Sequence, residues 1–147
     1  MRVVSTHNVN NVSVPSIGEV YMMNFTGDGS EQRGWRPGLV FQNNIGNKYS
    51  PNIIALPLTS SIKKSSQPTH VTLKARDTGL RFDSMVLCEN PKTISKHKIG
   101  QYLTSLPNEY MKQVAEAQIL ASSAISFLSK EDVLGVWQKA AEFNCTS

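Results

Sequence analysis

The chain has 147 residues, with 15 Lys and Arg against 11 Asp and Glu, and a net charge of +4 at pH 7. A hydrophobic fraction of 39% and a charged fraction of 18% exclude an intrinsically disordered chain, and the length suits one domain. Residues 63–98 carry eight basic and three acidic side chains, which permits a polyanionic partner. A solvated lysine surface would give the same composition.

The N-terminal part of the chain is expected to be a tail followed by short strands. Residues 1–16 are rich in Asn, Ser and Val, show no period and end at Pro15–Ser16, which predicts a loosely held tail. Apolar and β-branched runs bounded by turn residues come next. They predict strands over residues 17–25, 38–43, 52–59, 69–73, 84–89 with a continuation at 92–94, and 99–103.

The connections between these strands carry turn chemistry. Three glycines in residues 26–37 predict a loop, and residues 44–51 and 77–79 are predicted as turns. Pro91 interrupts the fifth strand and predicts a bulge or a sheet edge at that point.

The pattern becomes helical after Pro107, which suits a first helical position. Apolar residues recur at helical spacing as far as residue 128, and Ser129–Asp132 resembles a capping box. A second helix is predicted from its apolar stripe, formed by Val133, Val136, Trp137, Ala140 and Phe143. Strands followed by helices favour an α+β fold, namely a small β-barrel or strongly curved sheet closed by helices. We divide the chain into a tail (1–16), a main domain (17–128) and a helical extension (129–147).

The two cysteines, Cys88 and Cys145, are far apart and form no CxxC or metal-binding spacing. Unpaired thiols indicate a reducing compartment. The sequence has no N-terminal apolar segment of signal-peptide length and no run that approaches a membrane span. We therefore expect a cytoplasmic protein with no membrane association.

Two polar segments next to apolar strands indicate a phosphate-directed function. The glycine-punctuated segment 29–37 ends in Arg36–Pro37 and runs into the apolar residues 38–41, and the apolar run 53–57 ends at Leu58–Thr59. This order places an arginine and a hydroxyl at adjacent ends of two short strands. A guanidinium group and a hydroxyl can together hold a phosphate.

An ordered set of motifs between about residues 17 and 128 resembles the MazF/PemK family of toxin–antitoxin endoribonucleases, and its Gram-positive MazF branch most closely. The motifs are Gly18-Glu19-Val20-Tyr21, Gly29-Ser30-Glu31-Gln32-Arg33-Gly34, Arg36-Pro37, Gln42-Asn43-Asn44-Ile45-Gly46-Asn47, Tyr49-Ser50-Pro51, Leu58-Thr59-Ser60, Pro68-Thr69-His70-Val71, Gly79-Leu80, Asp83-Ser84 and Glu89 with Thr93-Ile94. Together they cover about three quarters of the chain.

The resemblance implies an SH3-like barrel with a C-terminal helix and a homodimer that holds RNA in a groove near the dimer interface. It also implies cleavage of single-stranded mRNA at a short sequence without a metal or other cofactor. A cognate antitoxin would occupy the same groove and bind DNA together with the toxin. The family's catalytic pair corresponds to Arg36 and Thr59 in this chain.

Cleavage without a metal can use the RNA's own 2′-hydroxyl as nucleophile, which requires a proton acceptor, a proton donor and positive donors around the phosphate. Arg36 suits charge stabilisation better than proton transfer, because a guanidinium group holds its proton too tightly to act as a base. Glu89 corresponds to a family carboxylate, but Leu87 stands where some branches have an arginine. Candidate RNA-binding residues are Ser30, Glu31, Gln32, Asn43, Lys63, Lys64, His70, Glu89, Asn90 and Lys92.

Two other functions remain compatible with the sequence. Relatives that use the same barrel poison DNA gyrase through protein contact, and the presence of both Arg36 and Thr59 argues against that function. A degenerate family member would bind RNA without cutting it.

Overall fold

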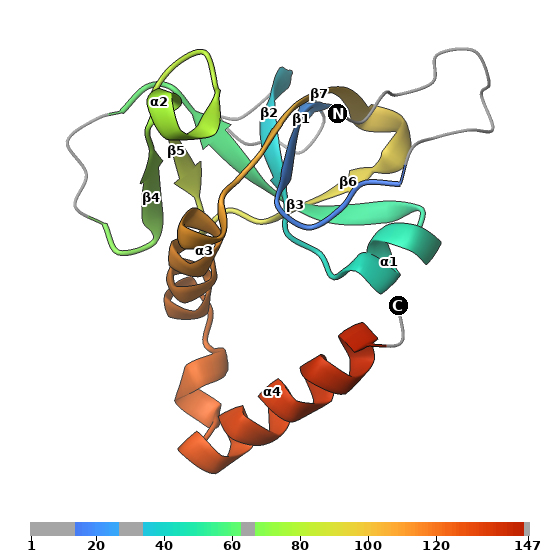
Figure 1. The fold of residues 1–147 in the computed structure, drawn as a ribbon, viewed down its shortest axis with the longest axis vertical. Helices are drawn as coiled ribbons and strands as arrows, with labels where there is room; N and C mark the ends of the chain where they lie inside the picture. Colours follow the sequence, from blue (N-terminus) through green and yellow to red (C-terminus); the bar gives the residue numbers. More distant parts are fainter. Residues whose placement is uncertain (1–13, 27–33, 63–66, 146–147) are drawn as a thin grey trace.

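The computed structural model describes residues 14–26, 34–62 and 67–145, so the predicted tail lies almost wholly outside the described residues. Figure 1 shows the strands gathered above two helices, α3 and α4. The strands are β1 (Glu19–Asn24), β2 (Trp35–Val40), β3 (Asn52–Thr59), β4 (His70–Leu73), β5 (Ser84–Leu87), β6 (Lys92–Ser95) and β7 (Ile99–Ser105). The helices are α1 (Asn44–Tyr49), α2 (Ala75–Thr78), α3 (Asn108–Ala121) and α4 (Lys130–Cys145), with short 3-10 turns η1 (Lys96–Lys98) and η2 (Ala124–Phe127).

The described strands form one antiparallel sheet in the order β4-β5-β3-β2-β1-β7, with β6 also paired to β3. The predicted α+β class is confirmed. The sheet is not closed into a barrel, because β4 and β7 end the path and are not paired with each other in the part of the chain that the structure describes.

β5 and β6 form one interrupted strand along the same edge of β3. Leu58 pairs with Val86 and Ala55 pairs with Lys92, so two residues of β3 face five residues of the other strand, 87–91. The three extra residues make a large bulge, closed by a hydrogen bond from the Asn90 N–H to the Leu87 carbonyl at 3.2 Å. The interruption lies opposite Pro57, which has no N–H to donate to a ladder. The bulge predicted from Pro91 is therefore present.

Both faces of the central strands are buried. Leu39, Leu56 and Leu58 belong to a core cluster that includes Val114 and Ala117 of α3. Val40 and Ala55, which alternate with them, belong to a second cluster with Ile53 and Phe25 on the opposite face. This arrangement explains the nearly continuous apolar run of β3, because a strand with a core on each side cannot alternate between apolar and polar residues.

Two segments predicted as turns contain short helices, so those two predictions were wrong. Residues 44–49 form α1, in which the Asn43 Oδ1 caps the helix by accepting from the Gly46 N–H at 2.8 Å. Asn47 is fully buried, and its Nδ2 donates to the Gln42 carbonyl at 2.8 Å. The burial of Asn47 and the local side-chain hydrogen bonds of two asparagines thus hold a helix that backbone propensity does not favour.

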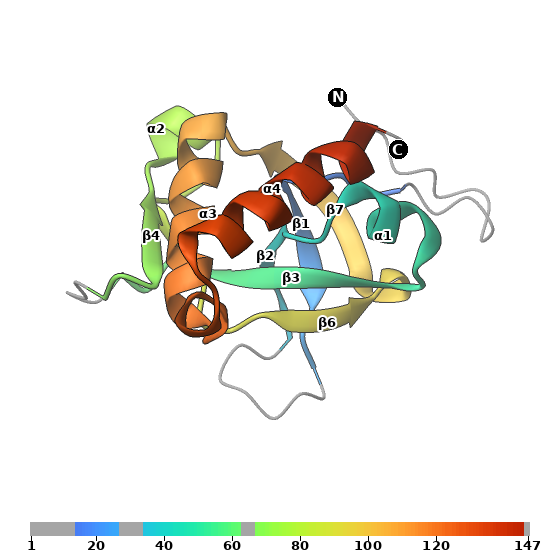
Figure 2. The ribbon, with the colours of Figure 1, turned by 90° about the horizontal axis from the view of Figure 1, so that it is seen from below.

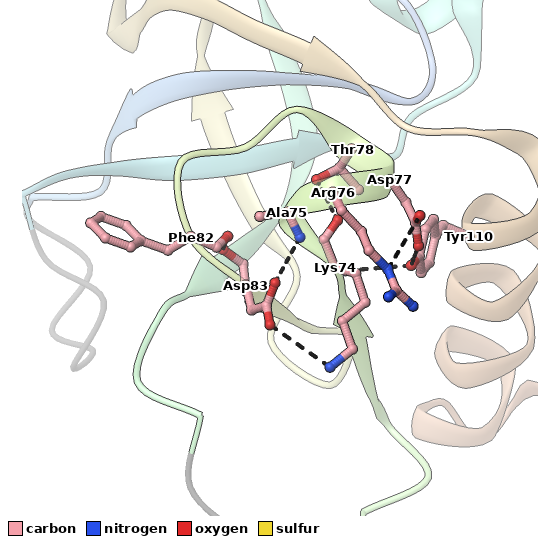
Figure 3. Close-up of polar contacts among 9 residues, drawn as sticks. Lys74, Ala75, Arg76, Asp77, Thr78, Phe82, Asp83 and Tyr110 are labelled. Carbon is pink, nitrogen blue, oxygen red and sulfur yellow. Dashed lines mark hydrogen bonds and ion pairs between the residues drawn. The ribbon is translucent and has the colours of Figure 1, made fainter.

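The second of these helices, α2, is tied to α3 by a polar cluster (Figure 3). The Tyr110 hydroxyl donates to the Asp77 Oδ2 at 2.7 Å, and the Asp83 Oδ1 accepts from the Ala75 N–H at 2.7 Å. Asp77 raises the pKa of the Tyr110 phenol, chiefly through this hydrogen bond. Gly79 ends α2 in the left-handed region at φ 77°, which an L side chain rarely adopts. The motif residues Gly79 and Asp83 therefore have structural roles.

The C-terminal region differs from the prediction in one boundary. The first long helix, α3, ends at Ala121 rather than near residue 128, and η2 fills the interval. The predicted capping box at the start of α4 is present, because the Ser129 N–H donates to Asp132 and the Asp132 N–H donates to the Ser129 Oγ. None of the helices in the described residues combines the length and the apolarity needed to cross a membrane.

Candidate active site

Arg36 and Thr59 are brought to neighbouring positions by the pairing of β2 with β3. The register of this pairing runs Val40 to Ala55, Leu39 to Leu56 and Gly38 to Pro57. Arg36 lies two residues before Gly38 and Thr59 lies two residues after Pro57, so both lie two residues beyond the last pair, at the same end of the β2–β3 ladder. Strand β2 begins at Trp35 rather than Gly38, so Arg36 is inside a strand and not in the preceding loop.

Alternation along the strands places both residues on the face of the sheet away from α3. Leu39 and Leu58 belong to the core cluster that contains residues of α3. Arg36 lies three residues before Leu39, and Thr59 lies one residue after Leu58. Successive side chains of a strand point to opposite faces. Arg36 and Thr59 therefore share the face of Val40 and Ala55, and neither is covered by α3.

The Thr59 hydroxyl is oriented by its own turn. Its Oγ1 accepts a hydrogen bond from the Ser61 N–H at 3.1 Å, and the side chain is half-buried. This bond uses an oxygen lone pair and leaves the hydroxyl's own hydrogen as a donor. The turn thus closes the end of β3 and fixes the position of the Thr59 oxygen.

His70 and Glu89 form a hydrogen-bonded pair on the same face. The His70 Nε2 lies 3.0 Å from the Glu89 Oε1, with the His70 side chain 14% exposed and the Glu89 side chain 37% exposed. His70 begins β4 and pairs with Leu87, whereas Glu89 lies in the bulge after β5. Because Val71 belongs to the α3-side cluster, the adjacent His70 points to the opposite face, which is that of Arg36 and Thr59.

The bulge also carries Asn90 and leads into Lys92. Both are half-buried, and Lys92 pairs with Ala55 at the start of β6. Lys92 therefore shares the face of Ala55, the same one that holds Arg36. The face thus combines two cations, a hydroxyl, an imidazole and a carboxylate from four strands and one bulge.

The remaining predicted RNA-binding residues do not join this group in the described structure. Asn43 is exposed and its side-chain oxygen caps α1. Five candidates lie outside the described residues: Ser30, Glu31, Gln32, Lys63 and Lys64. The segments that hold these five residues, 27–33 and 63–66, lie near Arg36 and Thr59 in the sequence.

Comparison with known proteins identifies the family of this chain. The family model described as "PemK-like, MazF-like toxin of type II toxin-antitoxin system" matches residues 16–121. The chain is 42% identical over 99 residues to Endoribonuclease EndoA of Bacillus subtilis (strain 168), which covers 67% of this chain and 85% of the relative.

The chain belongs to the MazF-like family of toxin–antitoxin endoribonucleases.

Solved structures share the fold of this MazF-like chain. The crystal structure of MazF from Deinococcus radiodurans superposes with a TM-score of 0.64 at 24% identity, covering 79% of this chain and 99% of its own. An endoribonuclease in complex with its cognate antitoxin, from a mycobacterial species, superposes with a TM-score of 0.61 at 23% identity, covering 78% and 98%. The superpositions thus cover almost the whole of these two solved chains. The match to the family model stops at residue 121, before α4 begins.

The apolar floor of the MazF-like site was missed by the sequence reasoning. Met85 and Leu87 alternate with Val86 and Cys88 of the α3-side cluster, so they lie on the site face, where Met85 pairs with Thr59 and Leu87 pairs with His70. Both are buried. The alternation of residues 84–88 could have assigned Met85 and Leu87 to the site face, but only after the face that α3 covers was known. An apolar floor weakens the competition of water for the polar groups at its rim.

Proposed function

We propose that this chain is the toxin of a type II toxin–antitoxin system and that it cleaves single-stranded mRNA at a short sequence without a metal ion. The observation that supports this proposal is the common face of Arg36, Thr59, His70 and Glu89, in a chain of the MazF-like family. The face offers the donors and the proton-transfer groups that attack by the 2′-hydroxyl requires.

In the proposed reaction the 2′-oxygen attacks the adjacent phosphorus and the 5′-oxygen leaves with the downstream fragment, which yields a 2′,3′-cyclic phosphate. Arg36 donates two parallel hydrogen bonds to the non-bridging oxygens, and the Thr59 hydroxyl donates a third. Their contribution grows as negative charge accumulates on those oxygens in the transition state. Arg36 acts as a charge stabiliser, because a guanidinium group is protonated at every pH of interest.

The His70–Glu89 pair supplies the group that takes the proton from the 2′-hydroxyl and returns a proton to the departing 5′-oxygen, so that the pair ends the step in its starting protonation state. The carboxylate accepts from one ring nitrogen of His70, which fixes the orientation of the imidazole. Leu87, which pairs with His70, occupies the position at which some branches of the family have an arginine. An apolar residue there favours proton transfer by the pair over a scheme that needs a second arginine.

The proposed partners follow from the family. A cognate antitoxin is proposed to bind over the same face and block it, since the structure of a mycobacterial endoribonuclease with the same fold was solved in complex with its cognate antitoxin. We also propose that the chain acts as a homodimer in the cytoplasm and that Lys92 and Asn90 hold the RNA beside the scissile phosphate. The toxin–antitoxin complex is proposed to bind DNA.

Incubation of the purified chain with a long transcript in EDTA tests the proposal. Discrete cuts are expected, with 2′,3′-cyclic phosphate ends, and a single 2′-deoxy substitution at a mapped site should abolish that cut alone. An intact transcript that is bound in a salt-sensitive manner would indicate a non-catalytic RNA-binding relative. An intact transcript without binding would indicate a toxin that acts by protein contact.

A further inference from the structure

Helix α4 has an apolar face that its own chain leaves exposed. Val133, Leu134, Val136 and Trp137 are all exposed, Trp137 to 68%. At 100° per residue, Val133, Val136, Trp137 and Ala140 fall on one side of the helix. The face is continued before the helix by η2 and the residue after it, where Phe127 is 81% exposed and Leu128 is also exposed.

A helix with such an exposed apolar face is stabilised by a partner that covers it. Its 16 residues only slightly exceed the ~12–15 below which helices without tertiary packing are marginal in water, and Gly135 in its interior costs a further ~1 kcal/mol relative to alanine. Figures 1 and 2 show α4 running from the lower end of α3 beneath the sheet, toward the side that holds α1. Large apolar surfaces on a projecting helix mark interaction sites.

The charges of the extension argue against RNA as the partner. Residues 122–145 carry two basic side chains, Lys130 and Lys139, against three acidic ones, Glu131, Asp132 and Glu142. This negative balance repels phosphates, in contrast to the basic segment 63–98. The extension also lies beyond the residues that match the family model, so the shared toxin fold does not account for it.

The pattern of charges beside the apolar face fits a second copy of the same helix. Asp132 and Lys139 are seven residues apart, two helical turns, and therefore lie along one border of the face. In an antiparallel pair centred between residues 135 and 136, Asp132 of each copy lies level with Lys139 of the other. The Asp132 Oδ2 caps α4 at 2.9 Å from the Ser129 nitrogen, which leaves Oδ1 as an acceptor for the lysine.

We propose that α4 pairs antiparallel with α4 of a second copy of this chain, through the face formed by Val133, Val136, Trp137 and Ala140. Opposed helix dipoles favour this direction. Trp137 and Phe127 each bring roughly 150–250 Å² of surface, a large share of the ~800 Å² per partner of a standard interface. This contact involves α4 and the residues just before it, so the proposal does not depend on whether the chain cleaves RNA.

Disulfide trapping tests the contact on the helix itself. In a Cys145→Ser background, Val136→Cys places a small apolar thiol near the two-fold axis, and Gln138→Cys is the matched control on the opposite side of α4. Cys88 does not interfere, because it is buried. Under mild oxidation the Val136→Cys chain is expected to form a covalent dimer in good yield, and the Gln138→Cys chain is expected to stay monomeric on a denaturing gel.

A second substitution separates specific pairing from random collision. Trp137→Glu added to Val136→Cys should reduce the covalent dimer at least tenfold, whereas Gln138→Glu, with the same change of charge, should leave its yield unchanged. Far-ultraviolet circular dichroism checks that α4 persists in each variant. Equal cross-linking of the Val136 and Gln138 positions, or none at either, would overturn the proposal and assign the face to a different partner.

Discussion

The His70 imidazole nitrogen Nε2 lies 3.0 Å from the Glu89 carboxylate, although 19 residues separate them in the chain. The contact follows from the pairing of β4 with β5, in which His70 lies opposite Leu87, so that Glu89 two residues later lies diagonally beside the first residue of β4. A carboxylate at this distance fixes the orientation of the imidazole ring.

Glu89→Gln tests the role of this pair in proton transfer. Glutamine keeps an oxygen that accepts from the imidazole but removes the negative charge, so the fold is preserved while the base is lost. We expect kcat for RNA cleavage to fall by about 10²- to 10⁴-fold with little change in KM. Single-turnover rates over a range of enzyme concentrations and pH measure both constants. A rise in KM with an unchanged kcat would instead assign Glu89 to RNA binding.

The pair formed by Arg36 and Thr59 is tested by conservative and non-conservative changes at each position. Arg36→Ala and Thr59→Val each remove a donor to the phosphate and should lower kcat about 10²- to 10³-fold. Thr59→Ser keeps the hydroxyl and should retain most of the rate. Arg36→Lys keeps the charge but loses the bidentate geometry, so an intermediate rate is expected. If Arg36→Ala cleaves as fast as the parent chain, the assignment fails.

Much of the scaffold could be predicted from the sequence because it follows from local patterns. Apolar runs located the strands, Pro91 located the bulge, and Ser129 with Asp132 located the start of α4. Each of these features depends on residues close together in the chain.

The features that the sequence did not reveal depend on burial and on how distant segments pair. Helix α1 was predicted as a turn, and it is held by the burial of Asn47 and by a local hydrogen bond from the Asn47 side chain to the Gln42 carbonyl. The contact of His70 with Glu89 depends on the register of β4 with β5, which pairs His70 with Leu87 and brings Glu89 to a diagonal position. The apolar floor at Met85 and Leu87 could be assigned only after α3 was placed on the other face.

Cys88 should be chemically inert in the folded protein. Burial, and secondarily the charge of Glu89, raises the pKa of its thiol from 9.0 to about 12. In a Cys145→Ser chain, iodoacetamide at pH 8 should not alkylate the native protein but should alkylate it fully in denaturant, as measured by mass spectrometry. Because the folded pKa is raised, this thiol favours the folded state below pH 9 and loses that contribution as the pH rises toward 12. Rapid labelling of the native chain at pH 8 would show that Cys88 is accessible.

Gly38 is expected to be essential for the packing beneath the Arg36–Thr59 pair. A Cβ at this position would lie 2.5 Å from the Met23 Sδ and 3.0 Å from the Phe25 Cζ, both in the buried cluster on the site face. Gly38→Ala should therefore lower the free energy of unfolding by about 1–3 kcal/mol, measured by urea denaturation. The matched control is Gly135→Ala in α4, where an added Cβ meets no atom within 4 Å and no loss of stability is expected. Equal stability of the two variants would show that β1 and β2 can separate to admit the methyl group. In that case a loss of cleavage in Gly38→Ala would come from displacement of Arg36 rather than from unfolding.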